Sequence, residues 1–278
     1  MKFGVALGRL NPAFFVAVAE AADELGFESV WLPEHMVFTS AMSRSPIPGE
    51  SHPPVPPETP IFDVFSYLSF IAARTTKVRI GTHVFNIGLR HPFTTARAVH
   101  TLDIVSGGRM EFGIGASWLE EEWRAAELDF ATRGARVDEC IEIYKRLSTE
   151  HEVAFAGDHF NFDGVVFEPK PVQRPWPPII VGGESNAALR RAARHGDGWI
   201  GMSHTLETAA NQIARLRDLL AAAGRDENDF QFCCGGPVTT LADVEAWDAI
   251  GVTRLIVAPW RRSPEAVDGL RAFAAALL

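Results

Sequence analysis

The stretch NPAFFVAVAEAADELGFESVWLP, residues 11–33, holds one helix followed by one strand and decides the fold class. Asn11 can cap a helix that has Pro12 at its first position, and Gly26 follows the last helical residue. Apolar side chains recur between these signals at spacings of three and four, which predicts a helix with one buried stripe. Residues 29–33 are an almost continuous apolar run, as expected of a parallel strand buried on both faces.

The same alternation of strand and helix continues along the chain. Apolar runs rich in Val, Ile, Phe and Trp predict eight strands, at 2–8, 29–33, 78–85, 109–115, 178–182, 197–202, 230–236 and 253–259. After the first helix, further helices are expected at 62–75, 92–106, 131–148, 186–195, 205–223, 240–249 and 264–277. Eight such units in 278 residues fit a closed (β/α)8 TIM barrel, with residues 1–278 as a single domain. A doubly wound open sheet is the alternative.

Two stretches interrupt this rhythm. Residues 39–60 contain seven prolines, which exclude a regular helix or strand. They follow the second strand, so in a barrel they lie at the catalytic mouth, where we expect an active-site lid. Residues 150–177 resemble a small hairpin and a proline-rich run, and they form an insertion before the fifth strand.

Composition narrows the class of function. The net charge is −9, which argues against a nucleic-acid or anionic-membrane surface. The sequence has no run of 18 apolar residues, so we expect no membrane-spanning helix. The pattern of the N-terminal residues favours a strand over a signal peptide. Three cysteines form no disulfide framework and no metal-binding spacing, so we expect a cytoplasmic protein without a metal site.

In a barrel enzyme the chemistry lies where the strands end, at the mouth. The second strand ends at Glu34 and His35, a carboxylate and an imidazole that can exchange protons near neutral pH. A surface turn is the alternative. The third strand runs from Gly81 through Thr82 to His83. A glycine inside a strand marks either the approach of a ligand or a barrel interior that needs a small residue.

The next two strands end in small residues. Gly115, Ala116 and Ser117 leave room for a flat ring at the end of the fourth strand, although no dinucleotide fingerprint is present. Residues 182–185, Gly-Gly-Glu-Ser, lead directly into a helix, and free backbone N–H groups there suit a phosphate. Either Arg133 or Arg136 on the preceding helix could add positive charge. An ordinary turn between strand and helix is the alternative.

Taken together, these motifs resemble the luciferase-like monooxygenase family, and in particular its branch that depends on the deazaflavin coenzyme F-420. The resemblance spans residues 3 to about 200, and the order and spacing of the motifs make it specific. The matching motifs are residues 26–35, Ile80-Gly81-Thr82, Arg90-His91-Pro92, Thr101-Leu102-Asp103, Ser106-Gly107-Gly108-Arg109, residues 113–119, Glu121-Glu122, Pro177-Pro178-Ile179, Gly182-Gly183 and Gly196-Asp197-Gly198-Trp199.

The resemblance implies roles for particular positions. Glu34 and His35 match the acid–His pair beside the ring, with His35 as the catalytic or substrate-orienting group and Glu34 fixing its orientation or pKa. One departure stands out, because Ala116 occupies the position where bacterial luciferase has an arginine on the flavin phosphate. Further matches are His83-Val84 with the non-proline cis peptide behind the ring, Gly115, Ala116 and Ser117 with the strand end lining the cofactor, and Arg136 with Gly183, Glu184 and Ser185 as the phosphate-binding positions.

The function implied is hydride transfer to or from a small, apolar organic substrate with coenzyme F-420 as cofactor. The alternative is a two-component monooxygenase that uses reduced FMN and molecular oxygen, with a separate reductase supplying the reduced flavin. A cofactor-less, non-catalytic barrel is a minor alternative. The resemblance also makes a homodimer, formed through barrel helices, compatible with this chain.

Overall fold

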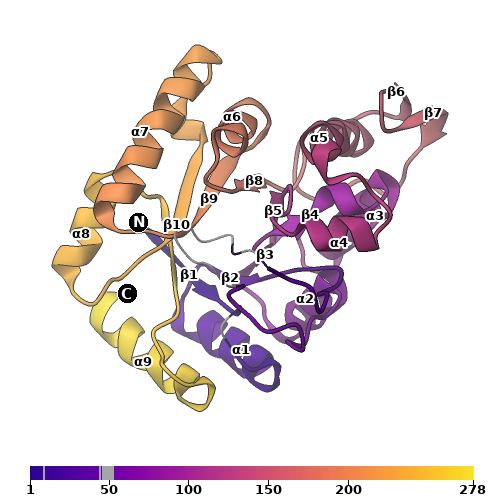
Figure 1. Ribbon diagram of the computed structural model, residues 1–278. Coiled ribbons are helices and arrows are strands. Elements are labelled where there is room, and N and C mark those ends of the chain that lie inside the picture. The colour runs from indigo at the N-terminus through magenta and orange to yellow at the C-terminus, as the bar shows by residue number, and fades with distance from the viewer. Residues whose placement is uncertain (9, 44, 46–52) are drawn as a thin grey trace.

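Eight parallel strands close into a barrel, which confirms the predicted fold (Figure 1). The computed structural model describes residues 1–8, 10–43, 45 and 53–278. Neighbouring strands pair in chain order, and pairing of β3 with β5 completes the closure. The barrel strands are β1 (Lys2–Ala6), β2 (Ser29–Leu32), β3 (Arg79–Thr82), β5 (Met110–Gly115), β8 (Ile179–Gly182), β9 (Gly198–Ser203), β10 (Gln231–Gly235) and β11 (Arg254–Val257).

The predicted third strand, 78–85, is divided in two. β3 ends at Thr82, and a two-residue strand, β4 (Phe85–Asn86), follows it. The cis peptide between His83 and Val84 lies in the gap. β4 pairs with the last part of β5, so the interruption stands at the mouth of the barrel.

Helices cover the outside of the barrel on all sides in Figure 1. Every predicted helix is present, and most of their bounds lie within two residues of the prediction. The sequence pattern missed α4 (Glu120–Ala125), because six residues are too short to display a helical period. The others are α1 (Phe15–Leu25), α2 (Val64–Arg74), α3 (Pro92–Val105), α5 (Arg133–Thr149), α6 (Asn186–His195), α7 (Leu206–Ala222), α8 (Leu241–Ala249) and α9 (Ala266–Leu277).

Trp31 fills the inside of the barrel. Its fully buried ring packs in a small cluster with Ile180, Ile200, Cys233 and Ile256, separate from the main core beneath the helices. A Cβ atom on Gly81 would lie 2.5 Å from Trp31 Cε3. The glycine in β3 therefore makes room for the tryptophan, which decides between the two interpretations of that position.

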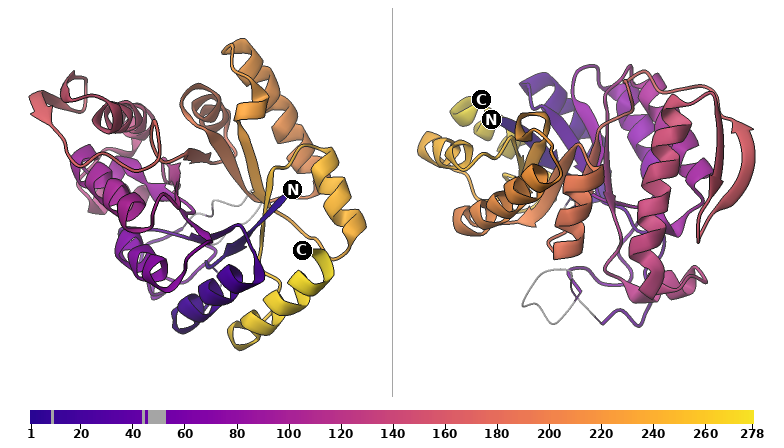
Figure 2. Two further views of the ribbon diagram at one scale, coloured as in Figure 1. Left: turned by 180° about the vertical axis from the view of Figure 1, so that it is seen from behind. Right: turned by 90° about the horizontal axis from the view of Figure 1, so that it is seen from above.

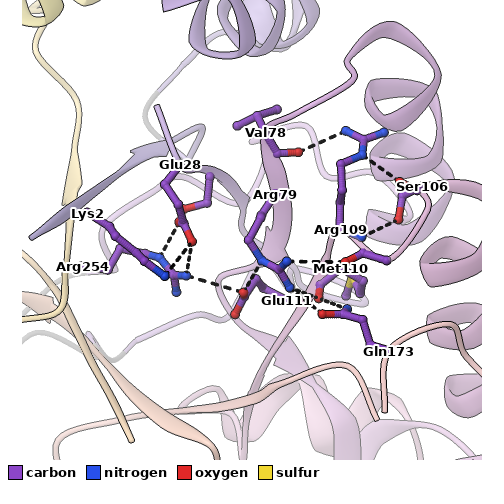
Figure 3. Close-up of polar contacts among 12 residues, drawn as sticks. Lys2, Glu28, Val78, Arg79, Ser106, Arg109, Met110, Glu111, Gln173 and Arg254 are labelled. Atoms are coloured by element: carbon purple, nitrogen blue, oxygen red, sulfur yellow. Dashed lines mark hydrogen bonds and ion pairs between the residues drawn. The ribbon is translucent and has the colours of Figure 1, made fainter. Parts of the chain in front are cut away.

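Charged side chains gather where the strands begin, at the opposite end of the barrel, and Figure 3 shows their contacts. Arg254, only 1% exposed, donates to the Glu28 carboxylate at 2.6 and 2.7 Å. It also lies 3.5 Å from Glu111, which is paired with Arg79 at 2.5 Å. Burial disfavours the ionised Glu28, but the bonds from Arg254 outweigh burial and lower its pKa. Paired charges thus balance one another at this end of the barrel.

The insertion before the fifth barrel strand is a hairpin, as predicted. β6 (Glu152–Ala156) and β7 (Asn161–Val166) pair antiparallel and project beside α5, outside the barrel (Figures 1 and 2). The described residues of the proline-rich stretch 39–60 contain no helix or strand, while residues 44 and 46–52 of the expected lid lie outside the described part. None of the helices in the described part of the chain combines the length and apolar character needed to cross a bilayer.

Candidate functional site at the barrel mouth

His35 stands at the mouth, just after β2. Its Nδ1 lies 3.1 Å from Glu122 Oε2, and its ring packs on Phe38 and edge-on against Trp118, with centroids 4.7 and 5.6 Å apart. The side chain is 15% exposed. Nε2 has no hydrogen-bond partner among the described residues, nor is it one of their buried unpartnered atoms. One ring nitrogen is therefore held by the protein and the other is open.

Glu34 points away from this histidine. Its Oε1 accepts from Arg90 Nη2 at 2.5 Å, and its Oε2 accepts from the Asn86 backbone N–H at 2.9 Å. Burial raises the pKa of the Glu34 carboxyl despite the adjacent Arg90. The expectation that Glu34 orients His35 is wrong for direct contact, because the two Glu34 oxygens bond to Arg90 and to the Asn86 backbone and not to His35. Glu34 instead fixes the segment after the cis peptide.

The carboxylate that contacts His35 belongs to Glu122, on α4. Glu122 is fully buried, and its Oε1 accepts from the Met36 backbone N–H at 2.5 Å. Its Oε2 accepts hydrogen bonds from Ser117 Oγ at 3.1 Å and from Asn86 Nδ2 at 3.4 Å. The same oxygen contacts His35 Nδ1. One side chain thus joins the segments that follow β2 and β5 to the end of β4. Sequence reasoning quoted Glu121-Glu122 only as part of a motif and assigned no role to Glu122.

The cis peptide between His83 and Val84 lies at the mouth of the barrel, between β3 and β4. The His83 ring packs edge-on against Trp31, 6.3 Å between centroids, and burial lowers its pKa to about 4. Val84 is partly exposed above the cluster around Trp31. A Cβ atom on Gly115 or on Gly182 would lie 2.7 or 2.8 Å from a Val84 methyl group. These two glycines therefore make room for Val84, so any space for a flat ring lies above that side chain.

The remaining small residues of the predicted site divide into buried and open positions. Thr82 is fully buried and donates from Oγ1 to the Gly113 carbonyl at 2.6 Å, so it supports the site only from behind. Ala116 and Ser117 are partly exposed at the mouth. Ser117 has φ of +63°, which turns the chain out of β5 and directs its hydroxyl to Glu122.

The turn between β8 and α6 presents unpaired backbone donors. Among the described residues, the N–H groups of 183–187 have no acceptor. Gly183 has φ of +119°, and Ser185 caps the helix by accepting from the Ala188 N–H at 3.2 Å. Glu184 turns aside, where its carboxylate accepts from the Met202 N–H at 2.9 Å and lies 3.2 Å from His204 Nε2. With that negative charge engaged elsewhere, the turn can receive an anion.

Arg136 lies on the first turn of α5, and its contacts within the protein are not with the turn that was predicted to share a phosphate with it. Nε donates to the Gly88 carbonyl at 2.7 Å, and the guanidinium stacks on Phe160 of the hairpin. Its two terminal nitrogens have no partner among the described residues and are not buried. No hydrogen bond or ion pair joins Arg136 to residues 183–187 within the described chain. It stays a candidate for an anion that spans the two positions.

A family profile described as "Luciferase-like monooxygenase" matches residues 2–274. The chain belongs to the luciferase-like monooxygenase family. A monooxygenase from Streptomyces bottropensis, RslO1, has a solved structure that superposes with a TM-score of 0.79 at 26% identity and covers 100% of this chain and 98% of that one. This agreement over both full lengths supports the barrel and its strand order.

Both cofactor classes of the luciferase-like family occur among the similar proteins. One is an FMNH2-dependent dimethylsulfone monooxygenase of Pseudomonas putida, 29% identical over 72% of this chain and 53% of its own. Another is the coenzyme F420-dependent tetrahydromethanopterin reductase of Methanopyrus kandleri, with a TM-score of 0.78 at 15% identity over 99% of this chain and 98% of that one. At that identity the second likeness shows the fold alone. The family is an oxidoreductase family, and this chain shares its architecture.

Proposed function

We propose that this protein is an oxidoreductase that uses coenzyme F-420 to move a hydride to or from a small, apolar organic substrate. The observation that carries the proposal is the state of His35, with Nδ1 held by Glu122 and Nε2 open. Hydride transfer at a carbon that bears oxygen needs one group to take or give the accompanying proton. The aromatic rings of Phe38 and Trp118 beside His35 favour an apolar substrate.

The residues at the mouth fit a deazaflavin. Coenzyme F-420, when bound, supplies the hydride acceptor or donor. Val84 and the partly exposed Ala116 offer an apolar surface for a flat ring. The unpaired N–H groups of residues 183–187 suit the phosphate, with Arg136 as a further candidate contact.

The chain's own groups then have separate tasks. His35 holds or releases a proton at Nε2 while Nδ1 stays on Glu122. Phe38 and Trp118 pack against the His35 ring and make the surroundings of that nitrogen apolar. The Glu34–Arg90 pair keeps the segment after the cis peptide in place.

A monooxygenase that uses reduced FMN, molecular oxygen and a separate reductase is the second candidate. The FMNH2-dependent relative in Pseudomonas putida favours it. Against it stands Ala116, because the luciferase position that contacts the flavin phosphate carries no cation here. We therefore rank it after the deazaflavin enzyme.

We also propose that the protein is a cytoplasmic homodimer. Its cysteines are free and buried, which fits a reducing compartment. An open apolar groove of about 590 Å³ lies between α2 and α3, lined by Phe65, Phe93 and Phe167, and Phe70 nearby is 55% exposed. A second copy covering this face would bury the exposed ring of Phe70. Sedimentation at micromolar protein tests it, since a monomer would refute the dimer.

Substitution of His35 tests the central proposal. His35→Ala is expected to lower kcat by about 10²- to 10⁴-fold, the range that general acid–base catalysis contributes, with cofactor affinity within a few-fold of the parent. Loss of cofactor binding together with normal turnover at saturation would contradict a catalytic role. Lys2→Ala, at the closed end of the barrel, is the matched surface control and should change neither quantity.

A further inference from the structure

We propose that Glu122 is the positioning residue of this site, holding His35 as the Nδ1–H tautomer so that Nε2 is the nitrogen that exchanges the proton. The inference deepens the proposed function and rests on it for its catalytic meaning. The tautomer itself is a property of the protein without cofactor. Neither the sequence motifs nor the likeness to known proteins assigns a role to Glu122.

The first argument is the chemistry of the partners around the Glu122 carboxylate. The Met36 backbone N–H can only donate, and it occupies Oε1 at 2.5 Å. Ser117 Oγ accepts from the Leu119 N–H at 3.1 Å, which leaves its own proton free to point at Oε2, also 3.1 Å away. An ionised carboxylate is an acceptor only, and every neighbour apart from His35 supplies a proton to it.

The second argument concerns where the proton between Glu122 and His35 must lie. If Oε2 carried it, the remaining lone pair would have to serve both Ser117 Oγ and Asn86 Nδ2. With Oε2 ionised, these donors stabilise its negative charge, and the ring nitrogen that faces an oxygen able only to accept must be the one that bears a proton. The shared proton therefore belongs to His35 Nδ1, at 3.1 Å, and the lone pair of the neutral ring is on Nε2.

Because Glu122 is buried, its carboxylate depends on these hydrogen bonds in place of water. Glu122 is 0% exposed, so its charge persists only while these hydrogen bonds persist. Two further charged groups near Glu122, Glu34 and Arg90, are bonded to each other, and the neighbouring Glu121 accepts from Ser43. Glu122 is therefore the only carboxylate among the described residues in contact with the His35 ring, and its charge balances the imidazolium that forms when Nε2 takes a proton.

The direct test is nitrogen NMR of the protein labelled with ¹⁵N-histidine, without cofactor. A His35→Gln variant identifies the His35 resonances among nine histidines. We expect Nδ1 to resonate as a protonated, pyrrole-type nitrogen and Nε2 as a pyridine-type one above the pH at which the ring deprotonates. In Glu122→Gln the two tautomers should mix, because an amide can accept from Nδ1 or donate to it. Glu120→Gln, two residues earlier on the same helix, is the matched control and should leave the spectrum unchanged.

A parent spectrum with the proton on Nε2, or a Glu122→Gln spectrum that equals the parent, would overturn the proposal. If Glu122→Gln fails to fold, Glu122→Asp serves instead. It keeps the charge but shortens the reach, and should give an intermediate mixture of tautomers. The parent spectrum alone already decides which nitrogen carries the proton.

Kinetics separate positioning from mere support of the fold. Glu122→Gln should lower kcat by about 10-fold or more, within the range of general acid–base catalysis, and leave KM within a few-fold. A rise in KM at unchanged kcat would refute positioning. Pure Nδ1–H tautomer without turnover on F-420 would leave the positioning intact and refute only the proposed cofactor.

Discussion

Substituting Gly115 with alanine tests the packing of the mouth most sharply. The added Cβ would lie 2.7 Å from Val84 Cγ2, well inside contact distance. Overpacking of this kind costs about 1–3 kcal/mol. Gly115 has no positive φ, so alanine also restricts the unfolded chain and returns about 0.4–1 kcal/mol. The net loss of unfolding free energy should be up to about 2.5 kcal/mol.

The same substitution behaves differently once the neighbouring methyl groups are gone. In a Val84→Ala background the clash disappears and only the effect on the unfolded chain is left. Gly115→Ala should then stabilise the protein by about 0.4–1 kcal/mol. The sign of the effect thus reverses between the two backgrounds, with a coupling energy of about 1–3 kcal/mol.

Urea denaturation of the four proteins in this cycle, followed by circular dichroism, measures the coupling. Gly26→Ala is unsuitable as a control, because Gly26 has φ of +88°. Ala116→Gly, one residue further along, changes the same atom at an open position and should show no coupling to Val84. If Gly115→Ala costs as much with Val84→Ala as without it, Val84 is not the reason for the glycine. Room for a ligand would then explain it better.

Further predictions concern the closed end of the barrel, pH and the anion turn. Arg254→Met should lower the unfolding free energy by about 3–5 kcal/mol in urea, because it removes the buried guanidinium that pairs with Glu28 and lies beside the buried Glu111; a change below about 1 kcal/mol would contradict the paired arrangement. Burial lowers the pKa of His100 from 6.5 to about 4, so the folded protein favours the neutral ring. The stability from this group is complete above pH 6.5 and is lost as the pH falls towards 4, and in urea titrations across that window His100→Gln should show a shallower fall than the parent. Arg136→Ala should weaken cofactor binding by about 1.5–3 kcal/mol in a fluorescence titration if it contacts the phosphate, and unchanged affinity would remove it from the site.

The fold could be predicted from local signals because they agree with one another. A capping residue, a helix and an apolar strand follow one another at Asn11, Gly26 and β2, and again at Ser185, Gly196 and β9. The sequence did not predict α4, because its six residues are too few to show a helical hydrophobic period and its first turn is entirely acidic. A short acidic stretch gives no signal that one of its carboxylates is buried.

The site was predicted less completely, and for a different reason. Motif order located the cis peptide at His83-Val84, and strand ends located His35. Which carboxylate faces His35 depends on side-chain direction and on a contact across 87 positions of the chain, between His35 and Glu122. Glu34 was chosen because it is adjacent in sequence, whereas its oxygens bond elsewhere. Glycine at 115 was assigned to a ligand for a similar reason, since Val84 is its neighbour only in space.

A binding titration of the purified protein with coenzyme F-420 and, separately, with FMN, each oxidised and reduced, tests the central claim most directly. The account predicts saturable binding of F-420 at micromolar concentration, weakened in Arg136→Ala and retained in His35→Ala. Binding of reduced FMN with no binding of F-420 would contradict it and make the protein a two-component monooxygenase.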